Sequence, residues 1–70
     1  MDSFTSAFGA HVRSLRLRRG MSQAEVAYLA GLHLTYLSGI ERGIRNPSFK
    51  NIRRVAVALG VGVGDLFSFE

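Results

Sequence analysis

The feature that most constrains the fold is a helix start signal followed a short distance later by a glycine. The run Ser-Gln-Ala-Glu at residues 22–25 is a capping box, in which two side chains bind amides left unpaired at a helix start. Val26, Leu29 and Ala30 follow with helical spacing, and Gly31 comes next. Because glycine readily takes the left-handed conformation that ends a helix, the pattern predicts a helix of about two turns that begins at residue 22 or 23.

A second short helix follows directly. It should begin near His33, point Leu37 and Ile40 inward and stop at Gly43, since these residues have helical spacing and a terminal glycine. Two short helices joined by a tight glycine turn form a helix-turn-helix. The sequence therefore predicts this motif at the centre of the chain.

Longer amphipathic segments flank the motif. The first should span residues 4–19, with Ser3 as its N-cap, Gly20 as its stop and an inward stripe of Phe4, Phe8, Val12 and Leu15. The other should start after a Ser48 cap and end at Gly60, with inward residues Phe49, Ile52, Val55, Ala56 and Leu59. A last short helix fits residues 64–67. We therefore expect an all-α fold of five helices, formed as one domain over residues 1–70.

Composition argues against several classes of protein. There is no cysteine, so no disulfide framework and no thiolate metal site is expected. His11 and His33 have no carboxylate partners at the spacing of metal ligands. The chain has few acidic residues, and no nucleophilic side chain stands next to a possible base in the sequence. Gly60, Gly62 and Gly64 lack the preceding strand of a nucleotide-binding loop. We expect no metal, no cofactor and no enzymatic activity.

No targeting or membrane segment is expected either. The start, Met-Asp-Ser-Phe, has no cationic region followed by an apolar one. The most apolar stretch, residues 55–64, has about half the length that a bilayer span needs. These features predict a cytoplasmic protein.

Charge is the first functional indication. All nine Lys and Arg lie between Arg13 and Arg54, opposed there only by Glu25 and Glu41. A concentrated positive field of this kind neutralises phosphates and steers association with nucleic acid. A solvated surface that only aids solubility is the simpler alternative.

Several motifs in order resemble one family. They are the runs Gly-Met-Ser-Gln-Ala-Glu-Val-Ala at 20–27, Ala-Gly-Leu at 30–32, Thr-Tyr-Leu-Ser-Gly-Ile-Glu-Arg-Gly at 35–43, Arg-Asn-Pro-Ser at 45–48 and Ala-Leu-Gly-Val at 58–61. Over residues 12–67 the chain resembles the Xre or phage-repressor (Cro/repressor-type) helix-turn-helix family. The third run, with Arg45 and Asn46, also resembles the controller proteins of restriction-modification systems. The resemblance implies a five-helix, lambda-repressor-like fold.

The resemblance further implies sequence-specific binding to double-stranded DNA, with the second helix of the motif in the major groove. Base readout falls to Gln23, Leu34, Thr35 and Gly39, with Gln23 matching a family residue that contacts either the DNA backbone or an outer base. Backbone contacts fall to Ser22, Tyr36, Ser38, Arg42, Arg45, Asn46, Lys50 and Asn51. Some alternatives stay open, because Leu34 can meet thymine methyls or pack on the protein, Thr35 can support only the helix start, and Tyr36 can be a packing ring.

Two further expectations follow from the resemblance. Arg16 and Glu41 match a structural pair that bridges the first helix to the end of the recognition helix. Family members usually bind two half-sites as homodimers. Part of the leftover apolar set Val57, Val63, Leu66, Phe67 and Phe69 is expected to form a two-fold interface near the C-terminus. The rival functions are an antitoxin, which would bind a partner toxin and its own operator, and the N-terminal domain of a longer repressor.

Overall fold

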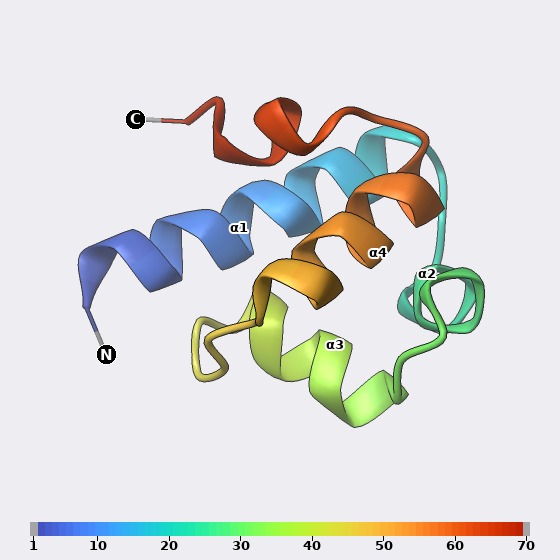
Figure 1. The fold of residues 1–70 in the computed structure, drawn as a ribbon, viewed down its shortest axis with the longest axis horizontal. Coiled ribbons are helices and arrows are strands. Elements are labelled where there is room, and N and C mark those ends of the chain that lie inside the picture. The colour runs from blue at the N-terminus through green and yellow to red at the C-terminus, as the bar shows by residue number, and fades with distance from the viewer. Residues whose placement is uncertain (1, 70) are drawn as a thin grey trace.

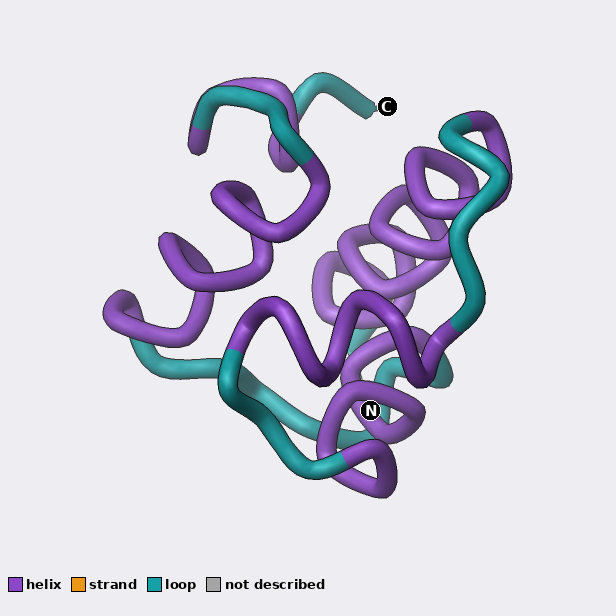
Figure 2. Tube along the Cα trace, turned by 90° about the vertical axis from the view of Figure 1, so that its right-hand side faces the viewer, coloured by secondary structure: helices purple, strands orange, loops and turns teal. Residues whose placement is uncertain are grey.

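The computed structural model describes residues 2–69, which form four α-helices and one short 3₁₀ helix. Their bounds are α1 Ser3–Arg18, α2 Gln23–Ala30, α3 Leu34–Glu41, α4 Phe49–Leu59 and η1 Val63–Phe67. No strand occurs in residues 2–69 (Figures 1 and 2). The all-α prediction is confirmed, but the count of five α-helices is not, because the last segment is a 3₁₀ helix of 5 residues. Such short tight turns commonly connect or end longer helices.

The helices pack around one apolar cluster. α1 contacts α3 and η1, α2 contacts α3 and α4, and α4 contacts η1. In Figure 1, α3 runs along the lower edge while η1 lies on the opposite side, above α1. The largest fully buried side chains come from every helix: Val12, Val26, Leu37, Ile40, Val55, Leu59 and Leu66. The helix-turn-helix is therefore held from behind by α1 and α4.

The predicted helix ends in the motif are confirmed. The Ser22 hydroxyl accepts from the Glu25 amide at 3.0 Å, and the Glu25 carboxylate accepts from the Ser22 amide at 2.9 Å. Gly31 ends α2 in the left-handed conformation with φ 69°. His33 precedes α3 but makes no side-chain cap bond, so α3 starts without the 0.5–2 kcal/mol or so that a good N-cap typically supplies.

The prediction for the start of α1 is wrong by one residue. Asp2, not Ser3, is the N-cap, and its carboxylate accepts from the Thr5 amide at 2.7 Å. Aspartate and serine are both good N-caps, so adjacent candidates are hard to separate from sequence. Ser48 is the cap of α4 as predicted and accepts from the Asn51 amide at 3.2 Å.

Three residues predicted to point inward are exposed instead. They are Phe4, Leu29 and Phe49. Each lies in the first or last turn of its helix, where the apolar stripe extends past the end of the core. Their exposure leaves apolar surface that the monomer does not use.

Close contact between α1 and α3 depends on Gly9. A Cβ added there would lie 2.1 Å from the Ile40 carbonyl oxygen and 2.8 Å from that of Glu41. These are backbone atoms, which cannot move aside as a flexible side chain can. Gly9 therefore sets how closely α1 crosses the end of α3, next to the Arg16–Glu41 contact.

No helix within residues 2–69 is both long enough and apolar enough to cross a membrane. Nor does the range contain three His, Asp or Glu side chains placed to hold a metal ion.

Candidate nucleic-acid interface

A buried ion pair joins α1 to the end of α3. The Arg16 Nε donates to Glu41 Oε2 at 2.7 Å, and the Arg16 Nη2 donates to Glu41 Oε1 at 3.0 Å. The Arg16 Nη1 donates to the Met21 carbonyl oxygen at 2.9 Å. The hydrogen bonds to the Glu41 carboxylate raise the pKa of the Arg16 guanidinium above its ordinary value. This bidentate geometry fixes direction as well as charge, so it holds α1, the following turn and α3 together.

The same carboxylate holds Gln23. The Gln23 Nε2 donates to Glu41 Oε1 at 3.0 Å. Only the amide nitrogen can donate to a carboxylate, so this contact sets which way the amide faces. One N–H and the carbonyl oxygen of Gln23 are left for another partner.

The first turn of α3 is the exposed part of the motif. Leu34 and Thr35 are both exposed, so Leu34 does not pack into the protein in this structure. Leu37 and Ile40, on the other face of α3, are fully buried. The exposed side chains therefore face outward at the start of the helix, where recognition helices contact base edges.

Tyr36 and Asn51 form a pair across α3 and α4. The Asn51 Nδ2 donates to the Tyr36 hydroxyl oxygen at 3.2 Å, and both residues are half-buried. A hydroxyl that accepts one hydrogen bond still has its own proton to donate. The pair therefore leaves the Tyr36 proton for an acceptor such as a phosphate oxygen.

Gly39 is buried under Arg45. A Cβ at Gly39 would lie 2.5 Å from the Arg45 Cγ, and the Gly39 carbonyl accepts from the amides of Ile44 and Arg45. The prediction that Gly39 itself contacts a base is therefore corrected, because the surface at this position of α3 is formed by Arg45.

The remaining residues predicted to contact the DNA backbone lie on α3 and on the segments before and after it. Ser22 is exposed but its hydroxyl oxygen accepts the capping bond. Ser38 is half-buried on α3, and Arg42, Asn46 and Lys50 are exposed at the end of α3, in the following loop and at the start of α4. Arg16–Glu41 is the only ion pair within residues 2–69, so the exposed cations keep their charge available.

The residues from which a dimer interface was predicted differ in exposure, since Val57, Val63 and Phe67 are exposed while Leu66 lies in the core. Leu66 is 0% exposed, so the prediction that it takes part in the interface is wrong. The apolar pattern of a helix of one or two turns does not show which of its sides meets the core. Val57 borders grooves with Met21 and with Leu29. Phe67 instead packs 5.0 Å from Phe8, measured between ring centroids.

An apolar cleft beside Phe67 was missed by the sequence analysis. It is lined by Phe4, Thr5, Phe8, Asn46, Pro47, Ile52 and Phe67. Phe49 lies three residues before Ile52 on α4, and residues at that spacing share a helix face. The signal that could have found the cleft is the excess of phenylalanine at helix ends.

The fold and this surface define a helix-turn-helix protein. Residues 12–66 match the family model described as "Helix-turn-helix". The chain is 49% identical to Control protein C.BamHI of Bacillus amyloliquefaciens over 89% of this chain and 78% of that protein.

Solved structures agree with this relationship. The restriction-modification controller protein C.AhdI from Aeromonas hydrophila has a TM-score of 0.89 at 43% identity, covering 90% of this chain and 96% of that chain. The controller protein C.Esp1396I, solved as a tetramer with its natural 35 base-pair operator, has a TM-score of 0.88 at 33% identity, covering 96% of this chain and 88% of that chain. The chain belongs to the Xre-type helix-turn-helix family of DNA-binding transcription regulators.

Proposed function

We propose that this protein binds operator DNA sequence-specifically, with α3 in the major groove, and regulates transcription from it. The observation that carries the proposal is the exposed first turn of α3, which is backed by a buried face and surrounded by unpaired cations. An α-helix fits the major groove, where each base pair presents a distinct pattern of donors and acceptors.

Base readout is assigned to Leu34, Thr35 and Arg45. The Thr35 hydroxyl can bond to a base, and the Leu34 side chain suits a thymine methyl. Arg45 lies across Gly39 on α3, and a guanidinium there can bind guanine with two hydrogen bonds. Arg45, predicted from sequence as a contact to the DNA backbone, would thus supply a guanine contact, which the apolar Leu34 side chain cannot make.

Contacts to the DNA backbone are assigned to the polar side chains around α3. Gln23 has its amide oriented by Glu41, and Tyr36 has its proton left free by Asn51. The α2 N-terminus adds amides that suit a phosphate. The other members of this set are Ser22, Ser38, Arg42, Asn46 and Lys50. Such contacts fix register without reading sequence.

The protein should bind as a homodimer through the cleft beside Phe67. Phe49 is 85% exposed, which is unusual for a large apolar side chain, and it lies one helical turn before Ile52, which lines the cleft. In a two-fold dimer a projecting group and a cleft on one surface can fill each other reciprocally. Operator binding by a tetramer of the relative C.Esp1396I supports an oligomeric binding mode.

The test is selection of bound fragments from random DNA, followed by footprinting of the best fragment at physiological salt. A pseudo-palindrome with half-sites about one helical turn apart, bound at least ~10³-fold more tightly than random DNA, is the expected result. Thr35→Ala should lower this ratio while leaving the salt dependence unchanged. Weak binding that is independent of sequence and lost with salt would overturn the proposal.

A further inference from the structure

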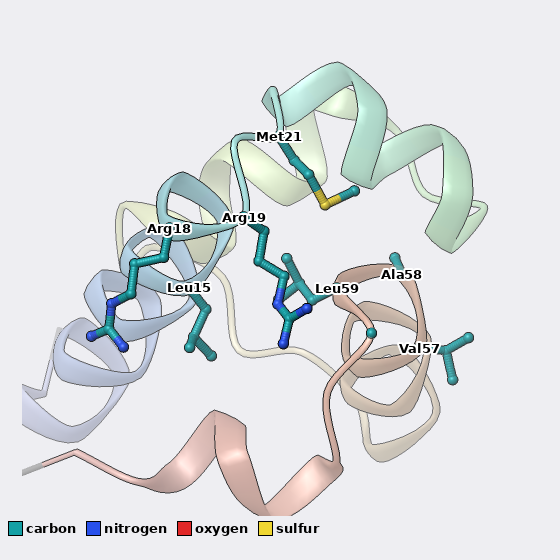
Figure 3. A pocket seen from close by; sticks show the side chains of 8 residues that line it. Leu15, Arg18, Arg19, Met21, Val57, Ala58 and Leu59 are labelled. Carbon is teal, nitrogen blue, oxygen red and sulfur yellow. The ribbon is translucent and has the colours of Figure 1, made fainter.

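An open groove lies where the ends of α1 and α4 meet. It has a volume of about 560 Å³, and its lining includes Leu15, Arg18, Arg19, Met21, Val57 and Leu59. In Figure 3, Arg19 and Met21 extend from the end of α1 and the turn after it toward α4. The groove thus combines apolar walls with two guanidinium groups.

Neither of these charges forms an ion pair within residues 2–69. Arg18 donates to the Ser14 hydroxyl, but neither Arg18 nor Arg19 has a carboxylate within ion-pair distance in residues 2–69. Arg19 lies near Gly60, at the C-terminal end of α4, where a cation meets the negative end of the helix dipole. That contact accounts for the position of Arg19 but leaves most of its five donors without a partner.

The groove lies far from the proposed DNA surface along α4. Asn51 bonds to Tyr36 at the start of this helix, whereas Val57 and Gly60 border the groove near its other end. At 1.5 Å per residue, Asn51 and Gly60 are about 13 Å apart along the axis. Phosphate binding by α3 and α4 therefore does not occupy the groove.

The shape favours a segment of a macromolecule over a small molecule. Small-molecule sites enclose most of their ligand, but this groove is open along one side. At Val57 it adjoins a second groove, lined by Leu29, Lys50, Arg53 and Arg54. The second groove is mainly basic and includes Lys50, which is assigned above to the DNA backbone, so the proposed site is limited to the first groove, whose lining has two arginines and no acidic residue.

We propose that the α1–α4 groove binds a short acidic, apolar segment of a partner protein. Its apolar side chains would cover Met21 and Val57, and its carboxylates would pair with Arg18 and Arg19. A nucleic acid fits less well, because phosphates gain nothing from an apolar wall. The inference rests on the proposed function only in requiring that partner and operator bind together.

The direct test needs no DNA. The probe is a fluorescein-labelled peptide in which Glu-Asp and Leu-Leu pairs alternate, titrated into the full protein by anisotropy and by amide chemical shifts. We expect saturable binding with the largest shifts at Leu15, Met21, Ala58 and Gly60. Val57→Asp, at a residue that is 69% exposed, should weaken binding at least tenfold without lowering Tm.

Charge is tested with a matched pair. Arg18→Glu together with Arg19→Glu should weaken peptide binding at least tenfold, whereas Arg13→Glu, an exposed arginine elsewhere on α1, should change it less than twofold. A peptide with serine in place of leucine should bind at least tenfold more weakly. Equal binding by the two peptides, or shifts spread over all the basic residues, would overturn the proposal.

The last step adds the selected operator. A ternary complex of protein, operator and peptide supports the inference, and mutual exclusion of peptide and operator contradicts it. Failure to select any operator would overturn the proposed function, while the peptide titration without DNA would still decide the groove. Saturable binding of laurate at these residues in place of the peptide would contradict a protein partner.

Discussion

The Arg16 Nε and the Glu41 Oε2 lie 2.7 Å apart, and both side chains are almost fully buried although 25 residues separate them in the chain. The same carboxylate also accepts from Gln23. One acidic group therefore connects the packing of α1 on α3 to the orientation of a proposed DNA contact.

Glu41→Gln should destabilise the fold and weaken operator binding. The change leaves the Arg16 charge buried without a countercharge, with only its bond to the Met21 carbonyl retained, and breaking a buried pair in this way costs about 3–5 kcal/mol. Urea denaturation measures the loss. Glu25→Gln is the matched control, since glutamine also serves in a capping box, and it should cost less than about 0.5 kcal/mol.

A double variant separates stability from positioning. Arg16→Met with Glu41→Leu replaces the pair by apolar groups, which often restores stability, but it cannot hold the Gln23 amide. We expect recovery of Tm with operator affinity still reduced. Equal recovery of both properties would show that Glu41 has only a structural role.

Gly39→Ala and Gly9→Ala should disturb different contacts. A methyl group at Gly39 meets the Arg45 Cγ, close to the root of that side chain, so the loop after α3 must shift, whereas one at Gly9 meets the Ile40 and Glu41 carbonyls of the backbone. Gly9→Ala should therefore lose on the order of 1–3 kcal/mol. Gly39→Ala should also lower Tm, by less than Gly9→Ala, because the loop that carries Arg45 must shift. Both Gly39→Ala and Arg45→Ala should weaken operator binding more than random-DNA binding. Competition assays against both DNAs measure this, and full operator affinity in Gly39→Ala would contradict the role of Arg45.

Tyr36→Phe should weaken binding to operator and random DNA to the same extent. It keeps the ring but removes the proton that the Asn51 contact leaves free, and a hydrogen bond to a charged group is worth about 1.5–3 kcal/mol. Affinity measured on both DNAs tests this expectation. Tyr28→Phe, on the exposed surface of α2, is the control and should have no effect. A loss confined to the operator would instead make Tyr36 a base-reading residue.

Phe49→Ser should shift the protein toward monomer without unfolding it. The side chain is 85% exposed, so the monomer loses little packing, while a buried aromatic anchor at an interface is commonly worth more than 1 kcal/mol. Sedimentation equilibrium should show a dimer dissociation constant that is larger by about tenfold or more. Tyr28→Ser, at an equally exposed aromatic of α2, is the control. An unchanged association constant for Phe49→Ser would place the interface elsewhere.

The start of α1 should loosen only in strong acid. The hydrogen bond from the Thr5 amide lowers the pKa of Asp2 from its ordinary value of 3.8. Because the folded-state pKa is lowered, the capping stabilisation is complete above the ordinary value of 3.8. It is lost as the pH falls through the lower folded-state pKa. The Thr5 amide shift should therefore titrate with a midpoint below 3.8, and Asp2→Asn should abolish this titration. A midpoint at or above that value would contradict the cap.

The parts that sequence reasoning predicted well are those set by local physics. The capping box of Ser22 and Glu25 and the left-handed glycine at Gly31 involve residues within one turn of each other, so their bonds follow from spacing alone. The inward positions of Val26, Leu37 and Ile40 follow from helical periodicity. The Arg16–Glu41 contact came from the resemblance to a family and not from spacing.

Contacts between distant segments were decided only by the tertiary structure. Periodicity places Phe49 and Leu66 on apolar stripes, but only the packed arrangement shows that Phe49 projects into solvent while Leu66 lies in the core. The cover of Arg45 over Gly39 and the bond from Gln23 to Glu41 depend on how a loop and two helices meet. The physical reason is range: caps and turns are settled within a few residues by the backbone, whereas burial and side-chain pairing depend on which other segment fills the space beside them.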